Sequence, residues 1–203
     1  MGLYSDYILP KYINSGMQSD DFAAERKKYI PLAHGVVLDV GAGSATNIPY
    51  FAGGVQKVLA LEPSDKLWAL GAERIAAAAF PVERLNASAE AIPLPDASVD
   101  TVVTAWSLCS IPNVAQALKE MRRVLKPGGT YIFMDHGKAH NKFTHWWQWL
   151  FRPACCWIGG GCHIDRSVPE LIKSAGFTIT KLDEGPGLKP LMYLYRGTAV
   201  PNK

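Results

Sequence analysis

The alternation of short apolar runs with helical patterns most restricts how this chain can fold. From Val36 to about Leu182, runs of strand length are separated by segments with helical periodicity, and most of these runs are apolar on both faces. Such strands are typical of a parallel sheet covered by helices. The predicted strands are 36–40, 57–61, 82–86, 99–104, 130–135, 178–182 and 192–196. The sequence therefore predicts an α/β fold.

Helical patterns separate these strands and also precede them. They cover residues 20–30, 65–79, 114–125 and 168–175, and a further helix is expected to begin at about Thr46. With 203 residues, 48% of them hydrophobic, the chain can build one sizeable core but is short for two. We expect a single domain over 1–203, in which 1–34 form a helical cover and 137–165 an insert near the substrate.

The charge balance and the lack of long apolar segments exclude several classes of protein. There are 21 basic and 18 acidic residues, and the basic ones form no dense run beyond 26–28, so no nucleic-acid partner is expected. No stretch has the roughly 18 to 20 apolar residues of a membrane span, and the first residues lack a signal-peptide pattern. We predict a cytoplasmic protein with a small-molecule substrate and four reduced cysteines.

The first strand ends in a turn of small residues, Gly41, Ala42 and Gly43. Backbone amides at such a turn favour an anionic group. A dinucleotide site would want glycine where Thr46 stands, which makes an NAD-dependent reductase a weaker alternative. Asp39, two residues before the first glycine, fits a ligand with both an ammonium and a carboxylate. The methionine end of S-adenosylmethionine carries both groups.

A second acid, Glu62, ends the next strand about twenty residues after the turn, with Pro63 beside it. An acid at this place accepts hydrogen bonds from ribose hydroxyls in nucleotide-binding folds. An ordinary turn and a solvated strand end would give the same pattern, so the pair indicates a nucleoside site only together with other motifs.

Two later segments, 86–100 and 118–129, resemble motifs of the class I S-adenosylmethionine-dependent methyltransferases, in the order and spacing of that family. The resemblance implies a Rossmann-like, seven-stranded, mostly parallel sheet with helices on both faces and an antiparallel last strand. It also implies S-adenosylmethionine as cofactor, with Ser88 and Ala89 at the adenine edge. The family more often has Asp where Ser88 stands, so this contact lacks charge assistance.

Ligands of open α/β sheets bind beyond the carboxyl ends of the strands, which directs attention to the residues after the fourth and fifth strands. Ala105 and Trp106 are predicted cofactor contacts; Trp106 either holds its ring against the sulfonium or belongs to the core. Cys109 is a predicted substrate contact. His136, with Asp135 beside it, is the candidate general base or acceptor-orienting group, or simply a polar strand end.

The insert carries an aromatic stripe. Its members share one helical face: Phe143, Trp146, Trp147, Leu150 and Phe151. We expect this helix to pack on the domain, while a lid over an apolar substrate, with Trp146 touching it, and a peripheral membrane contact are the alternatives. Exposure of Trp149, which falls outside the stripe, would favour these alternatives.

The end of the insert holds Cys155, Cys156, Cys162 and His163. Adjacent cysteines are poor tetrahedral partners and no Cys-x-x-Cys pair is repeated, so no metal site is predicted. The thiols could instead receive arsenite as a substrate. His163 is taken as a substrate-side residue.

Three segments, 108–111, 133–136 and 161–166, look like those of the alkyl thiol methyltransferases of the methyltransferase-like group. This resemblance implies methylation of a small thiol or other soft nucleophile. Phospholipid or amine N-methylation, metalloid methylation and non-catalytic cofactor binding remain the alternatives. The sequence does not indicate the oligomeric state.

Overall fold

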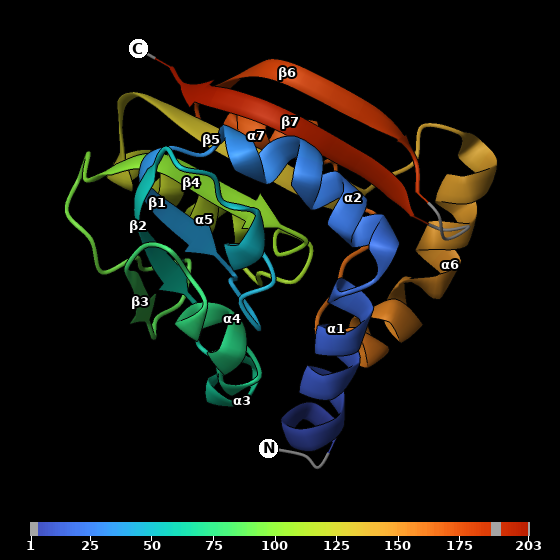
Figure 1. Ribbon diagram of the computed structural model, residues 1–203. Coiled ribbons are helices and arrows are strands. Elements are labelled where there is room, and N and C mark those ends of the chain that lie inside the picture. Colours follow the sequence, from blue (N-terminus) through green and yellow to red (C-terminus); the bar gives the residue numbers. More distant parts are fainter. Residues whose placement is uncertain (1–3, 188–191, 203) are drawn as a thin grey trace.

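The computed structural model describes residues 4–187 and 192–202, so residues 1–3 of the expected N-terminal cover lie outside the described part (Figure 1). Seven strands form one sheet in the order β3-β2-β1-β4-β5-β7-β6. The strands are β1 Gly35–Val40, β2 Val55–Leu61, β3 Val82–Leu85, β4 Val99–Ala105, β5 Leu125–Gly137, β6 Phe177–Pro186 and β7 Tyr193–Pro201. β1 to β5 pair in parallel, whereas β7 runs antiparallel to both β5 and β6. The predicted fold class is confirmed.

Helices cover both faces of this sheet. They are α1 Leu9–Met17, α2 Asp20–Tyr29, α3 Asp65–Ala69, α4 Ala72–Ala76, α5 Val114–Val124, α6 Lys142–Ile158 and α7 Val168–Ser174, with short π- or 3₁₀-helical turns at Tyr4–Ile8, Ile30–Leu32 and Ile48–Tyr50. One apolar cluster packs α5 and α7 on the sheet through Leu118, Met121 and Ile172. The other includes Tyr29 and Ile30 from α2 and the turn after it. Figure 1 shows α2 on one face and α5 and α7 on the other.

Two helix predictions are wrong. Only a single 3₁₀ turn follows Thr46. In an α-helix that began there, the ring of Pro49 would clash with the carbonyl of Ala45, and Pro49 has no N–H to donate to that carbonyl. The predicted helix 65–79 is divided into α3 and α4 at Gly71. A Cβ at Gly71 would lie 2.7 Å from the Ser44 carbonyl oxygen, so the chain approaches the turn after β1 too closely for a larger residue.

α6 stands away from the sheet beside α1, and its contacts differ from the expected ones (Figure 1). Its only fully buried side chain is Gln148, whose amide accepts from Ala139 N (2.8 Å) and donates to the Gly137 carbonyl (2.9 Å). At its end, Tyr4 Oη donates to the Ile158 carbonyl (2.5 Å), and the Tyr4 ring stacks on Trp157. Hydrogen bonds from a buried amide therefore fix this helix to the sheet.

The aromatic stripe of α6 faces outward, so the helix packs on the domain as expected but through its opposite side and not through the stripe. Of its members only Trp147 is half-buried, and Phe143 and Trp146 are 73% and 51% exposed. Trp149 is 60% exposed. The helix forms where its periodicity predicts, but the side chain that it buries against the rest of the domain is the polar Gln148. In the described residues no helix is long and apolar enough to cross a membrane.

Candidate active site

A cavity of about 350 Å³ opens at the carboxyl ends of β1, β2 and β4. This volume lies within the range of roughly 300 to 1,000 Å³ for small-molecule sites. Nine of the ten residues predicted to contact the cofactor line it: Gly41, Ala42, Gly43, Glu62, Pro63, Ser88, Ala89, Ala105 and Trp106. The structure therefore brings together motifs that are spread over the first half of the chain.

The turn after β1 is held by β2. The amides of Gly41 and Ala42 both donate to the Leu61 carbonyl (2.9 and 3.1 Å). Gly41 has φ +70°, and a Cβ there would lie 2.5 Å from Cβ of Ser107, so both backbone conformation and space require glycine. The turn is consequently fixed against the strand that carries Glu62.

The Glu62 carboxylate lies at the entrance to this turn. Its Oε2 accepts from Gly43 N (2.9 Å) and its Oε1 from Ser64 N (2.8 Å). The side chain is buried, and burial raises its pKa, opposed by these two amide hydrogen bonds. Each oxygen keeps a further lone pair for a ligand hydroxyl, since a carboxylate has about four acceptor sites.

Asp39 is the one predicted cofactor residue that does not line the cavity. It is fully buried, and its two carboxylate oxygens accept from Asn47 Nδ2 (2.9 and 3.2 Å). Burial raises the pKa of Asp39 to about 7, opposed by the Asn47 hydrogen bond and by Arg26. Asp39 therefore acts on the cavity through Asn47, which does line it.

Arg26 is a cavity residue that sequence reasoning missed. It comes from α2 and is 2% exposed, with Nε donating to Asn47 Oδ1 (2.9 Å) and a terminal nitrogen donating to Thr46 Oγ1 (2.9 Å). Burial lowers its pKa to about 10, so it stays a cation at neutral pH. In the sequence it belongs to an ordinary basic run, 26–28, and nothing there separates it from the exposed lysines that follow it.

Trp106 stands between this cavity and a second one. It has φ +55°, its amide donates to the Met134 carbonyl (2.7 Å), and the Arg26 guanidinium carbon lies 4.8 Å from its ring centroid. Within the described residues, Trp106 Nε1 and Ser107 Oγ are buried without a hydrogen-bond partner. Unsatisfied polar atoms beside a cavity are what a ligand with hydrogen-bonding groups would use, and this observation fits a bound nucleoside cofactor.

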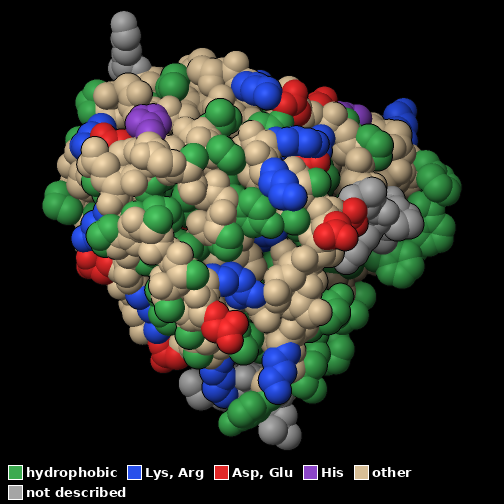
Figure 2. All heavy atoms as spheres, viewed as in Figure 1, with side chains coloured by type: hydrophobic (Ala, Val, Ile, Leu, Met, Phe, Trp, Pro, Cys, Tyr) green, Lys and Arg blue, Asp and Glu red, His purple; other side chains and the backbone are tan. Residues whose placement is uncertain are grey.

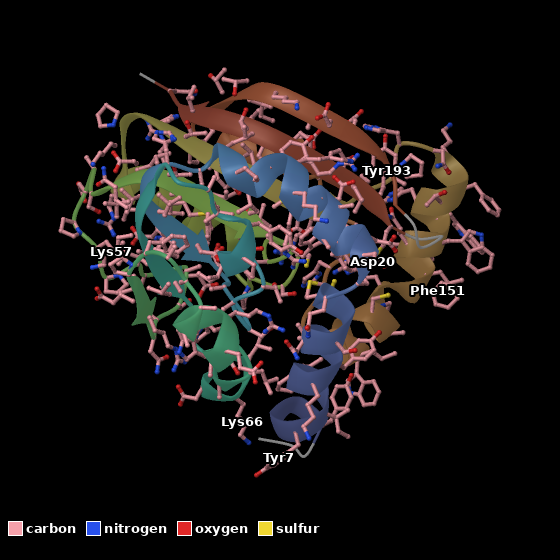
Figure 3. All side chains as sticks on the ribbon, viewed as in Figure 1. Tyr7, Asp20, Lys57, Lys66, Phe151 and Tyr193 are labelled. Carbon is pink, nitrogen blue, oxygen red and sulfur yellow. The ribbon has the colours of Figure 1, made fainter. Side chains whose placement is uncertain are left out.

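The second cavity, of about 480 Å³, adjoins the first and shares Ile13, Met17, Trp106, Ser110 and Gly159 with it. Apolar side chains of α1 and α6 form much of its wall, including Ile158. Cys109 and His136, both predicted on the substrate side, line it as well. Figure 3 shows the side chains between α1, α6 and the sheet.

Three other predicted site residues lie outside both linings. Trp146 is on the outer face of α6. His163 lies behind the second cavity, where its amide donates to the Cys109 carbonyl (2.9 Å). Asp135 is fully buried and accepts from Leu108 N (2.7 Å) and His136 N (2.8 Å), so it holds the loop after β4 and the end of β5 in place.

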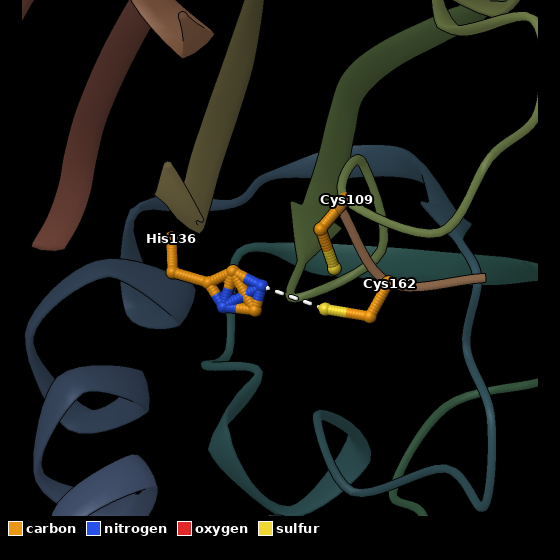
Figure 4. A group of neighbouring side chains, drawn as sticks. All are labelled: Cys109, His136 and Cys162. Carbon is orange, nitrogen blue, oxygen red and sulfur yellow. Dashed lines mark hydrogen bonds between the residues drawn. The ribbon is translucent and has the colours of Figure 1, made fainter. Parts of the chain in front are cut away.

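A cluster of Cys109, His136 and Cys162 forms one side of the second cavity (Figure 4). His136 Nε2 lies 3.0 Å from Cys162 Sγ, and one side-chain donor atom of each residue lies within 4.8 Å of the others. The pKa of the Cys109 thiol is raised well above its ordinary value. The larger cause is a hydrogen bond with Cys162, and the second is burial. The sequence associated Cys162 with Cys155 and Cys156 instead, because only the fold brings the β4 loop to this segment.

This fold and these motifs are those of the class I methyltransferases. The methyltransferase domain family matches residues 38–133. Among curated proteins, human thiol S-methyltransferase TMT1A is 31% identical over 150 residues, 72% of this chain and 61% of the relative. Human thiol S-methyltransferase TMT1B is 33% identical over 111 residues, 54% of this chain and 45% of the relative. Residues 38–133 form a methyltransferase domain, and the expected resemblance to the class I S-adenosylmethionine-dependent methyltransferases and the expected cofactor are confirmed.

Solved structures agree on the fold. Burkholderia thailandensis 1,6-didemethyltoxoflavin-N1-methyltransferase, solved with 1,6-didemethyltoxoflavin and S-adenosylhomocysteine bound, has a TM-score of 0.72 at 18% identity, covering 99% of this chain and 88% of that one. A methyltransferase from Aquifex aeolicus has a TM-score of 0.65 at 21% identity, covering 95% and 98%. The chain spans 45% to 61% of the length of the two human relatives.

Proposed function

We propose that this chain transfers a methyl group from S-adenosylmethionine to a small thiol or other soft nucleophile. The observation that carries the proposal is the meeting of two cavities at Trp106, one built from the methyltransferase motifs and the other apolar with thiol and imidazole groups at its side. The similarity to thiol S-methyltransferases supports a thiol as acceptor.

In this proposal the first cavity holds the cofactor. Glu62 accepts from the ribose hydroxyls, Ser88 and Ala89 lie at the adenine, and the Arg26 cation beside the 41–43 turn receives the methionine carboxylate. Asn47, oriented by Asp39, lies beside the same end. When bound, S-adenosylmethionine supplies a methyl carbon that its sulfonium already activates, so the protein chiefly aligns the acceptor and excludes water.

In the second cavity the acceptor needs little catalytic help. A free thiol has a reference pKa of about 8.5 and becomes a strong nucleophile once it loses its proton. The His136 imidazole faces this cavity and is the group we propose to accept that proton. Its backbone is fixed by the hydrogen bond to Asp135.

The direct test is incubation with S-adenosylmethionine carrying a labelled methyl group and a panel of thiols, amines, a phospholipid and arsenite. We expect labelled thioethers and S-adenosylhomocysteine, identified by mass spectrometry. The His136→Ala variant should lower turnover more than cofactor affinity, whereas His140→Ala, on an exposed residue paired with Glu184, should change neither. Transfer to amines or arsenite alone would replace the thiol assignment, and cofactor binding without any transfer would leave a binding protein.

We further propose that the outer faces of α1 and α6 contact a membrane surface near the mouth of the acceptor cavity. Exposed apolar side chains include Tyr7 in the turn before α1, Tyr12 on α1, and Trp149 and Trp157 on α6. Figure 2 shows hydrophobic side chains gathered along the side where these helices lie. α6 carries basic residues and no acidic one, which suits anionic headgroups.

A cytoplasmic location and the absence of a nucleic-acid partner stay predictions, as does a single domain over 1–203.

A further inference from the structure

We infer that Cys109, His136 and Cys162 form a Zn²⁺ site whose fourth coordination position opens into the acceptor cavity. Three separate segments supply the ligands: the loop after β4, the end of β5 and the segment that follows α6. No metal site was predicted from the sequence, because the cysteines that are neighbours along the chain are not the ones that meet in space.

The distances suit a tetrahedral ion. Zn–S bonds of about 2.3 Å and Zn–N bonds of about 2.0 to 2.1 Å place tetrahedral S and N ligands about 3.6 Å apart and two S ligands about 3.8 Å apart. The three donor atoms already lie within 4.8 Å of one another, with His136 Nε2 and Cys162 Sγ at 3.0 Å. Binding of an ion therefore needs the separations of the donor atoms to change by up to about 1 Å, which is within the reach of side-chain rotation.

The backbone around the ligands is held before any ion binds. Asp135 accepts from the amide of the ligand His136 on β5 and from that of Leu108, the neighbour of Cys109 in the loop after β4. The Cys109 carbonyl accepts from His163 N (2.9 Å), which ties the β4 loop to the segment carrying Cys162. Arg166 donates to the carbonyls of Leu108 and Ile111 and adds a second tie between these segments. Such outer contacts fix the direction in which metal ligands point.

The three donor groups and their surroundings indicate a metal ion with one coordination position left open. Two thiolates and one imidazole match the softness that Zn²⁺ prefers, and three protein ligands leave a place for a fourth. All three residues line the acceptor cavity, so that place faces the site where the acceptor lies. If the proposed function holds, the ion takes over the role of proton-accepting base given above to His136, which then serves as a ligand. The acceptor thiol binds the ion, its proton goes to solvent or to a buffer base, and the thiolate is presented to the methyl carbon.

The experiment is a metal titration of the reduced, chelator-treated chain. Co²⁺ serves as the spectroscopic probe, and Zn²⁺ affinity is measured by competition with a chromophoric chelator. We expect one ion per chain, thiolate-to-cobalt charge-transfer bands, and visible absorption of tetrahedral intensity. Zn²⁺ binding should be weakened in each of the three ligand variants, Cys109→Ser, His136→Ala and Cys162→Ser. Loss of a residue that only orients a ligand weakens metal binding about 10- to 100-fold, and loss of a ligand should weaken it more.

Cys155→Ser is the matched control, because this thiol lines the same cavity but lies outside the cluster. It should leave Zn²⁺ affinity unchanged, and calorimetric binding of S-adenosylmethionine should show that every variant is folded. Absence of saturable Zn²⁺ binding in a chain that binds the cofactor would overturn the inference. Equal weakening by Cys155→Ser, or a Cys109–Cys162 disulfide that persists under reducing conditions, would also overturn it. Zn²⁺ binding without methyl transfer would contradict only the proposed function, and thiol methylation by a chain that binds no Zn²⁺ would contradict only this inference.

Discussion

At the scale of single residues, the two acids found by their spacing along the chain have different environments. Glu62 lies at the cavity with its oxygens on two backbone amides, whereas Asp39 lies beneath it and meets the cavity through Asn47. A carboxylate on the cavity wall can bind a ligand directly. A carboxylate that is fully buried instead affects how the pH of the solution changes stability.

Replacing Glu62 by Ala should weaken S-adenosylmethionine binding about 100-fold. The reason is the loss of charge-assisted hydrogen bonds, each worth about 1.5 to 3 kcal/mol. Isothermal titration calorimetry measures the affinity. Glu83→Ala, on an exposed acid of β3 paired with Lys57, is the control and should bind as the wild type does. An unchanged affinity in Glu62→Ala would remove this residue from the ribose.

Replacing Asp39 by Asn should change how stability depends on pH. The pKa of Asp39 is about 7 in the folded chain, against about 3.9 when unfolded, so between pH 4 and 7 the folded state binds more protons. The contribution of Asp39 to the free energy of unfolding of the wild type is therefore fully present below pH 4. It is lost as the pH rises to 7, at up to about 1.4 kcal/mol per pH unit. In Asp39→Asn the side-chain oxygen at position 39 still accepts from Asn47, but the side chain does not titrate, so this loss of stability does not occur.

Urea unfolding of both proteins between pH 4 and 8 measures this difference. The stability of Asp39→Asn relative to the wild type should increase with pH and level off above about pH 7. A difference that stays constant across this range would show that Asp39 is not the group that titrates there.

Residues in local motifs could be predicted from the sequence, and residues brought in by tertiary contacts could not. The turn, Glu62 and Ser88 follow strand ends, and parallel strand ends converge at one edge of a sheet. Arg26 and Cys162 reach the cavities from helical and loop segments whose position only the packing decides. No pattern around either residue distinguishes it from its neighbours in the sequence.

At the scale of elements, all seven strands were found. The central parallel strands β1, β2 and β4 were the clearest, because they are mostly buried and mostly apolar. Helices were less certain. Pro49 and the close approach at Gly71 override patterns that read as helical. In α6 the periodicity was right, but the buried face carries Gln148 and the exposed face carries the aromatic rings. Amphipathicity gives two faces, and it does not say whether water, protein or lipid meets the apolar one.

The exposed face of α6 makes a prediction of its own. Vesicles containing an anionic phospholipid should shift the tryptophan emission of the chain to shorter wavelength and should carry the chain with them on sedimentation. The double variant Trp146→Ser with Trp149→Ser should bind more weakly, since two large apolar side chains are lost. Leu182→Ser, an exposed apolar position on β6, is the control. Vesicle binding that is insensitive to the α6 variant would assign the contact to another surface.

At the scale of the whole molecule, the sheet brings one nucleoside-sized cavity and one apolar cavity together at its carboxyl edge, while α1 and α6 form the outer wall of the latter. A chain with this arrangement can hold a polar cofactor and an apolar acceptor on two sides of Trp106. The two ligands would then meet where water has little access.

A crystal structure of the chain with S-adenosylhomocysteine tests this account most directly. We predict the nucleoside in the cavity of about 350 Å³, its ribose hydroxyls on Glu62, its amino-acid end at the 41–43 turn, and its sulfur toward Trp106 and the acceptor cavity. A structure in which this compound binds elsewhere, or in which the cavity stays empty at saturating concentration, would contradict the account.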